Sequence, residues 1–415
     1  MNNTKDKSLY FPLKIALTFL IISELLVWIG PLKYFLFNGS KLILYLIIVN
    51  IALYLGYKRG MKSFHPTKLS FTMPTVYLLL LLGLILTVRS CKMMWARHGL
   101  PFNINTLVYA LVNPGDSYHS KATEELDISS LTILFAPFQW IAIPLGIYYW
   151  KKLPKLFKTI VILTFAFETI SWLGIGTRKG IFDIIIISFF LIIANNKDIL
   201  KKPTAYRRLK IWTFIGILLF LFYFILSNLS RGGKELEDLA DTMKTVDFNP
   251  FYKKHLPLWL VVALSNITSY LCQGYYALDK ALSLGIKPIT PGGQSWFTIM
   301  LANKVGYDPL PDTYLNALQT YGIDMRINWH TIYVWLANEF TFIGVPFIIY
   351  IIGYCFAQTW LDSINHENPL AFPTFALFLI MVYYFYANNQ VISFSFMPFV
   401  VCVFFYYFFR LIRSR

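Results

Sequence analysis

Ten runs of apolar residues recur along the chain, and each is close to the length of a helix that crosses a membrane. A hydrocarbon core about 30 Å thick needs roughly 20 apolar residues per helix. The runs cover residues 12–30, 41–57, 70–88, 131–149, 157–176, 181–195, 211–229, 340–360, 371–388 and 395–411. They predict an all-α polytopic integral membrane protein of about 10 transmembrane helices, with residues 1–415 forming a single membrane domain.

Composition argues against the main alternative, a soluble protein that uses its charge to bind nucleic acid. Of the 415 residues, 57% are hydrophobic and 14% are charged, whereas soluble domains carry about 25% charged residues. The formal net charge of +16 would otherwise suggest a polyanionic partner. Because so apolar a chain has little solvated surface on which to display charge, we expect membrane lipids and no nucleic acid as partners.

The distribution of Lys and Arg predicts the orientation, since cytoplasmic loops carry an excess of both. With the N-terminus inside, the inner segments hold 20 of the 37 Lys and Arg residues and four of the 21 acids. The whole excess of +16 therefore lies on one side. These segments are 1–14, 58–68, 151–158, 196–210, 361–370 and 410–415. We expect both termini to be cytoplasmic.

All the long loops then fall on the outer side, at 89–130 and 230–339. The second contains an apolar stretch, Leu256–Leu284, that is long enough to span. If it did span, every later helix would reverse and the basic C-terminus would face outward. We therefore expect this stretch to form a re-entrant or interfacial helix, and the short apolar piece Trp296–Leu301 to do the same.

Two pairs of cations lie at outer helix ends. Arg178 and Lys179 occupy a tight turn between two predicted helices, and Arg231 and Lys234 flank a pair of glycines after the seventh apolar run. A guanidinium at this depth can hold a lipid diphosphate through two parallel hydrogen bonds, and glycines let backbone N–H groups approach an anion. The alternatives are interfacial anchors, a charged helix end, and a Lys179–Asp183 pair at i, i+4.

A histidine and a carboxylate come together near the end of the second outer loop. His330 precedes a predicted helix whose outer part carries Glu339. A histidine near a carboxylate can remove a proton from a hydroxyl at neutral pH, and Trp329 and Trp335 could stack on sugar rings. The alternative is an ordinary helix N-terminus with interfacial aromatic residues.

Three acids fall within the apolar runs, namely Glu24, Glu168 and Asp183. A charge buried in a bilayer costs at least about 2.5 kcal/mol, so each is a candidate for function or a structural partner of an arginine. Cys91 and Cys272 fall on the same predicted side of the membrane. They could form a disulfide or remain two isolated buried thiols.

Three local features, in this order and on one side, resemble the bacterial oligosaccharide repeat unit polymerases, the O-antigen polymerase (Wzy) group. They are Thr177–Gly180, Ser230–Gly232, and Trp329–Thr331 leading into Phe342–Val345. The resemblance extends over most of the chain as architecture: many spans, inner termini and a large outer loop in the C-terminal half. It also implies an arrangement similar to GT-C membrane glycosyltransferases. An R-x10-G pattern of some members is absent here.

The resemblance implies a bacterial inner-membrane enzyme that joins polyprenyl-diphosphate-linked oligosaccharide units on the periplasmic face and releases polyprenyl diphosphate. It implies Arg178, Lys179, Arg231 and Lys234 as diphosphate-binding residues. His330 would be the base, with Glu339 as its orienting residue or as the alternative base. Sugar binding is assigned to Trp329, Trp335 and Arg326. No metal and no cofactor are expected, and a chain-length regulator is an expected partner.

Three other functions stay open. An O-antigen ligase would use the same donor with a lipid-core acceptor. A lipid-linked-oligosaccharide flippase or other transporter would be expected to show a polar path through the membrane and internal repeats. A noncatalytic membrane assembly protein would tolerate loss of every cation named above.

Overall fold

A computed structural model describes residues 8–97, 101, 103–112, 130–174, 179–196, 199, 202–229, 246–326 and 328–413. Within these ranges, eight helices are long and apolar enough to cross a membrane. They are α2 (Phe11–Ile29), α3 (Gly39–Lys62), α4 (Met73–Arg97), α7 (Ser130–Tyr149), α8 (Lys155–Gly174), α10 (Pro203–Leu229), α16 (Ile332–Asn365) and α18 (Gln390–Arg413). The protein is an all-α polytopic membrane protein, as the apolar runs predict.

The remaining two predicted spans are shorter helices, α9 (Lys179–Asn195) and α17 (Ala371–Tyr383). The 13 residues of α17 rise about 20 Å at 1.5 Å per residue, too little to cross a 30 Å core. The expected continuous span over 371–388 is therefore wrong at its outer end. Non-helical backbone over 384–389 follows instead, almost all of it buried in protein, which is where a membrane protein tolerates irregular backbone.

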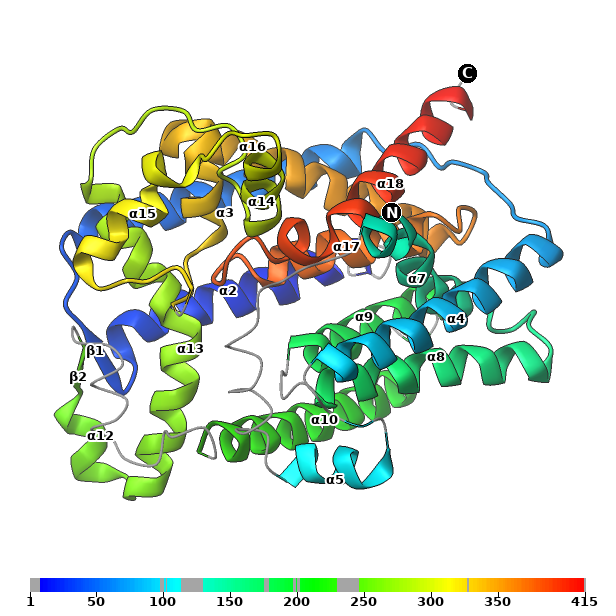
Figure 1. Cartoon of the computed structure of the whole chain (residues 1–415), viewed down its shortest axis with the longest axis horizontal. Helices are drawn as coiled ribbons and strands as arrows, with labels where there is room; N and C mark the ends of the chain where they lie inside the picture. Colours follow the sequence, from blue (N-terminus) through cyan, green and yellow to red (C-terminus); the bar gives the residue numbers. More distant parts are fainter. Residues whose placement is uncertain are drawn as a thin grey trace.

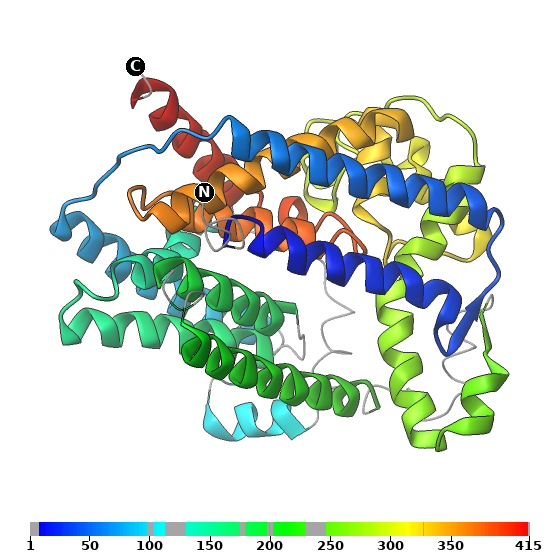
Figure 2. The ribbon, with the colours of Figure 1, turned by 180° about the vertical axis from the view of Figure 1, so that it is seen from behind.

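Helices α3 and α16 pack together at very short range because glycines line their contact. A Cβ atom on Gly56 would lie 2.0 Å from the carbonyl oxygen of Tyr350, and one on Gly60 would lie 2.5 Å from that of Tyr354. From the other helix, a Cβ on Gly353 would lie 2.4 Å from the carbonyl oxygen of Leu53. Small residues spaced by four let helix backbones approach inside membranes. Figure 2 shows α3 running beside α2 on the same face.

The predicted inner segments meet at one end of the bundle, which we call the Asp362 end. Trp360 Nε1 donates to the carbonyl of Ser8 at 3.0 Å, and Tyr148 OH donates to that of His366 at 2.9 Å. The start of α10 joins the same region, since Lys202 and Lys151 line one cavity. The expected grouping of these segments on one side is consistent with this arrangement.

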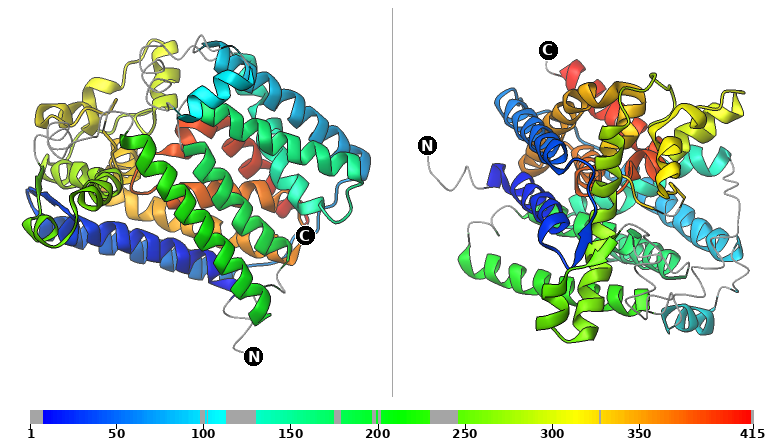
Figure 3. Two further views of the ribbon diagram at one scale, coloured as in Figure 1. Left: turned by 90° about the horizontal axis from the view of Figure 1, so that it is seen from below. Right: turned by 90° about the vertical axis from the view of Figure 1, so that its left-hand side faces the viewer.

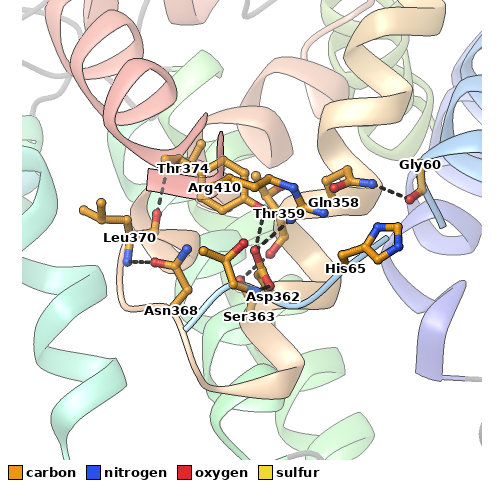
Figure 4. A network of polar contacts seen from close by, with 12 residues as sticks. Gly60, His65, Gln358, Thr359, Asp362, Ser363, Asn368, Leu370, Thr374 and Arg410 are labelled. Atoms are coloured by element: carbon orange, nitrogen blue, oxygen red, sulfur yellow. Dashed lines mark hydrogen bonds and ion pairs between the residues drawn. The ribbon is translucent and has the colours of Figure 1, made fainter. Parts of the chain in front are cut away.

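A buried ion pair ties this end together (Figure 4). Asp362 on α16 is fully buried and accepts a hydrogen bond from Arg410 Nη1 at 3.1 Å and one from Tyr406 OH at 2.7 Å. Its other oxygen accepts from the backbone N–H of Thr67 at 3.2 Å. A buried carboxylate needs its lone pairs occupied, and here residues from α16, α18 and the α3–α4 connection share that role.

Helix α13 (Leu258–Ser283) crosses the opposite end of the molecule. Figure 1 shows the long helices running across the page with α13 standing nearly upright at one end, and the right view of Figure 3 shows it passing over that end. A helix that lies along a membrane surface runs across the direction of the membrane-crossing helices, as α13 does. Asp279 anchors it by accepting the backbone N–H groups of Phe37 and Asn38, the latter at 2.9 Å.

Short elements complete this end, which we call the His330 end. They are α12 (Pro250–His255), α14 (Trp296–Lys304), η2 (Leu310–Asp312), α15 (Tyr314–Leu318), η3 (Gln319–Tyr321) and the antiparallel pair β1 (Leu32–Tyr34) and β2 (Val246–Phe248). Helix α14 contains the apolar piece that was expected to be interfacial. Between α4 and α7, the described part of the first expected outer loop forms α5 (Ile104–Val112).

The four cysteines are free thiols, so Cys91 and Cys272 form no disulfide. Both side chains are fully buried, and the reading as isolated buried thiols holds. Cys272 instead packs on α2, where its thiol lies 3.5 Å from the carbonyl oxygen of Ser23.

Candidate functional site

His330 lies at the centre of a set of hydrogen bonds at the His330 end. Its backbone N–H donates to Asn388 Oδ1 at 2.9 Å, and its carbonyl accepts the backbone N–H of Asn388. The same Asn388 oxygen accepts from Trp335 Nε1 at 2.9 Å. The stretch before α16 is therefore joined to the non-helical link between α17 and α18 by both backbone and side chain.

Local backbone geometry explains why an asparagine holds this position. Asn388 has a φ of 56°, in the left-handed region that asparagine tolerates better than most residues. Next to it, Ile332 N donates to the carbonyl of Phe385 at 3.0 Å. Helix α13 packs against the link at Gly274, where an added Cβ atom would lie 2.1 Å from the carbonyl oxygen of Tyr386. The link, the start of α16 and α13 form one closely packed junction.

The imidazole of His330 is fully buried, and burial lowers the pKa of His330 from 6.5 to about 4. The Asn328 carbonyl and the charge of Asp324 oppose this effect without cancelling it. The ring is thus neutral at pH 7. His330 Nδ1 lies 3.1 Å from the carbonyl oxygen of Asn328, and because a carbonyl can only accept, Nδ1 carries the proton. Nε2 therefore holds the lone pair.

Unpartnered polar atoms gather around this junction. His330 Nε2 is buried with no hydrogen-bond partner among the described residues, and so are four oxygens of neighbouring side chains: Thr331 Oγ1, Asn389 Oδ1, Gln390 Oε1 and Ser393 Oγ. Buried polar atoms are nearly always paired with protein, water or a ligand. All five belong to the segment before α16, to the link or to the first turn of α18.

In the described part of the chain, the hydrogen bonds of Glu339 go to residues other than His330. Its Oε1 accepts the backbone N–H of Gly292 at 2.8 Å and its Oε2 accepts from Gln294 Nε2 at 3.0 Å. The carbonyl of Gln294 in turn accepts from Asn389 Nδ2 at 3.1 Å. Glu339 thus holds the loop before α14 against α16 and connects to the junction through that loop. The helix that carries it kinks two residues later at Thr341, where φ is 56°.

The three residues expected to bind sugars lie in different settings. Trp335 is fully buried, with Trp296 5.9 Å away between ring centroids, so it presents no face for a sugar and instead supports Asn388. Trp329 is half-buried, edge-on to Tyr270 at 5.3 Å. Arg326 is exposed. Only Trp329 and Arg326 are accessible as the sequence-based hypothesis requires.

Lys179 is the one residue of the expected diphosphate-binding set within the described ranges; Arg178, Arg231 and Lys234 lie outside them. Lys179 forms an ion pair with Asp183, which is the i, i+4 alternative anticipated from the sequence. Its ammonium also lies over the rings of Tyr384 and Phe394, 5.2 and 5.5 Å from their centroids. Lys179 is therefore anchored beside the same α17–α18 link that holds His330.

The other two acids within spans have neutral partners. Both oxygens of Glu24 accept from Asn50 Nδ2 at 2.9 Å. Glu168 accepts from Gln139 Nε2 at 3.1 Å and from Trp172 Nε1 at 3.0 Å. These hydrogen bonds join α2 to α3 and α7 to α8, which gives both acids a structural role in the bundle.

Sequence reasoning missed the polar residues of the link, Asn388, Asn389 and Gln390, and their partner Gln294. A signal was present, because Asn388-Asn389-Gln390 is a run of three carboxamides between two strongly apolar segments. Such a run in a membrane protein needs hydrogen-bond partners away from lipid. The sequence shows that this run lies between two apolar segments, but it does not show that Asn388 pairs with His330, 58 residues away.

Comparison of the chain with protein-family models, with curated proteins and with solved structures finds no significant match.

Proposed function

We propose that this protein is a membrane glycosyltransferase that polymerises polyprenyl-diphosphate-linked oligosaccharide units at the His330 end of the bundle. The proposal places that end on the periplasmic face of a bacterial inner membrane and the basic Asp362 end in the cytoplasm, because Lys and Arg gather in inner loops. The resemblance in sequence motifs supplies the substrate class, and the geometry around His330 supports the type of chemistry.

The observation that carries the proposal is the state of His330. The Nδ1–H of a neutral imidazole donates to the carbonyl of Asn328, which leaves the Nε2 lone pair without a hydrogen-bond partner among the described residues. This tautomer is that of a general base. Burial makes the imidazolium unfavourable, and an incoming diphosphate would offset this effect because nearby negative charge raises the pKa of a histidine.

In the proposed reaction, Nε2 of His330 removes the proton from a hydroxyl of the acceptor sugar. The hydroxyl oxygen forms a bond to the anomeric carbon of the donor, and the bond from that carbon to the diphosphate oxygen breaks. Polyprenyl diphosphate leaves with the bonding electrons, and the proton passes from Nε2 to solvent. Positioning and charge stabilisation account for the catalysis, so the reaction needs no cofactor.

In this proposal, Arg178 and Arg231 bind the diphosphate and balance its negative charge as it leaves, and Lys179 assists them. Asp183 neutralises much of the charge of Lys179, so Lys179 alone could not balance the negative charge of a diphosphate. A guanidinium beside it would add two hydrogen bonds in a fixed geometry.

The test is polymer length on a gel, in cells that lack the chromosomal gene and express variants at matched levels. We expect His330→Ala and Arg178→Ala to yield single repeat units in place of long polymer. Lys304→Ala is the matched control, since Lys304 is exposed on α14 at the same end and its loss should leave polymer length unchanged. Wild-type polymer from His330→Ala would remove His330 from the mechanism.

The same gel separates the polymerase from its rivals. Loss of a polymerase leaves single units attached to their final acceptor, whereas loss of a ligase leaves none attached. A flippase is distinguished with purified protein in lipid discs, where only a transferase releases polyprenyl diphosphate from a lipid-linked donor.

A further inference from the structure

A cavity of about 450 Å³ opens at the Asp362 end, away from the junction around His330. It lies where the end of α7, the end of α9, the start of α10 and the end of α16 converge. Its polar lining comes from Lys151, Asn195, Asn196, Lys202 and His366, with Ala205 and Ile364 among its apolar residues. A volume of this size is in the range of sites that hold small ligands.

The described lining of the cavity carries charge of one sign. Lys151 and Lys202 both belong to it, and no Asp or Glu does among the described residues. Neither ammonium has a hydrogen bond or an ion pair to another residue in the described part of the chain, in contrast to Arg410 nearby, which is paired with Asp362. Two cations that line one cavity repel each other, and a bound anion would offset this repulsion.

Two contacts hold together three of the elements that line the cavity. Asn195 Nδ2 donates to the carbonyl of Ile147 at 2.7 Å, which fixes the end of α9 against α7. His366 ends α16 with a φ of 59°, and its ring lies 4.0 Å from that of Tyr148 between centroids. These contacts join three of the converging elements independently of the lysines. The cavity therefore does not depend on Lys151 or Lys202 for its shape.

We propose that this cavity binds the phosphate of an anionic phospholipid of the adjacent leaflet. The shared chemistry is a phosphate ester held by two ammonium groups, with the carboxamides as further hydrogen-bonding groups. A lipid is the favoured source because the cavity lies where helices long and apolar enough to cross a membrane begin or end, and basic pockets between such helices bind anionic headgroups. The apolar residues of the cavity are suited to contact the part of the lipid next to its headgroup.

The experiment is native mass spectrometry of the purified full chain in detergent, with phosphatidylglycerol and phosphatidylcholine as competing probes. We expect the wild-type protein to retain phosphatidylglycerol in preference. Lys151→Gln combined with Lys202→Gln should weaken that retention about 30-fold, which corresponds to about fivefold per lost cation. Equal retention of the two lipids by the wild-type protein would overturn the proposal.

The matched control is Lys152→Gln combined with Lys155→Gln, which removes the same charge from two exposed lysines that follow Lys151 closely in the sequence and are not among the cavity-lining residues. It should change retention less than threefold; a loss equal to that of the first pair would show a general basic surface and no site. A second variant, Ala205→Phe, fills the cavity without changing charge and should also abolish the preference. Full preference in Ala205→Phe would contradict binding inside the cavity.

Inorganic phosphate separates the two sources of the ligand. If the site takes a lipid, phosphate should not displace phosphatidylglycerol or raise the melting temperature of lipid-free protein. If phosphate alone stabilises the protein and the effect needs Lys151 and Lys202, the ligand is a soluble phosphate compound and the lipid assignment is wrong. These measurements do not depend on glycosyl transfer, so their outcome tests the lipid site independently of the proposed activity.

Discussion

The backbone N–H of His330 donates a hydrogen bond to Asn388 Oδ1 at 2.9 Å, and the carbonyl of His330 accepts one in return from the backbone of Asn388. This pairing joins the segment before α16 to the link between α17 and α18. It fixes the position of an imidazole that is buried, neutral and unpartnered at Nε2.

Replacing Asn388 should loosen the junction. In Asn388→Ala, the N–H groups of His330 and Trp335 lose their shared acceptor and a left-handed φ is imposed on alanine. We expect a loss of about 2–3 kcal/mol in the free energy of unfolding, measured as a lower melting temperature in detergent. Asn388→Gly is the control, because glycine accepts the φ and loses only the hydrogen bonds. It should recover part of the loss; no recovery would mean that the backbone angle is unimportant.

Stability should depend on pH through His330. The unfolded histidine titrates near 6.5 and the folded one near 4. Between these values the unfolded state binds more protons, so stability rises with pH from about 4 to about 6.5 and is flat for this group outside that window. The full change is on the order of 3 kcal/mol.

The measurement is the melting temperature as a function of pH for wild type and His330→Gln. The variant should lose most of this slope, whereas His255→Gln, at an exposed position, should keep it. An unchanged slope in His330→Gln would show that other groups cause the pH dependence.

The Lys179–Asp183 pair should be strongly coupled, because its side chains are only 15% and 11% exposed. Removing one partner leaves a charge with little water around it, which costs about 3–5 kcal/mol for buried pairs. We expect Lys179→Met and Asp183→Leu each to destabilise the protein, and the double variant to be more stable than either. Additive losses in the double-mutant cycle would contradict this coupling.

Activity separates the two roles of Lys179. If Lys179 only balances Asp183, the double variant should also regain wild-type polymer length. If Lys179 contacts the diphosphate, polymerisation should stay impaired although stability recovers.

The contact of α3 with α16 should be intolerant of a single methyl group. A Cβ on Gly56 would lie 2.0 Å from the carbonyl oxygen of Tyr350, so Gly56→Ala must push the helices apart, at a cost of about 2 kcal/mol or more. The control is Gly216→Ala on α10, where a Cβ meets nothing within 4 Å. Alanine there should be neutral or stabilise by up to about 1 kcal/mol. Melting temperatures of the two variants in detergent test this difference.

The sequence alone determined the class of the protein and the approximate place of every long helix, because crossing a hydrocarbon core requires a long apolar run and nothing local can replace it. It also indicated that Leu256–Leu284 does not follow the other runs, and α13 indeed crosses their direction. The Lys179–Asp183 pair could be read from spacing because i and i+4 share a helix face. Gly56 and Gly60 show the same spacing, a small-residue signal the sequence analysis did not use.

Only the tertiary structure decided which residues surround His330. Glu339 is nine positions away and points to Gly292 and Gln294, whereas Asn388 is 58 positions away and forms the direct contacts. Likewise, the apolar run over 371–388 did not predict that a short helix would be followed by buried irregular backbone. The physical reason is common to both: hydropathy records how apolar a segment is, but the partner of a buried polar group depends on which segments the packed helices bring together.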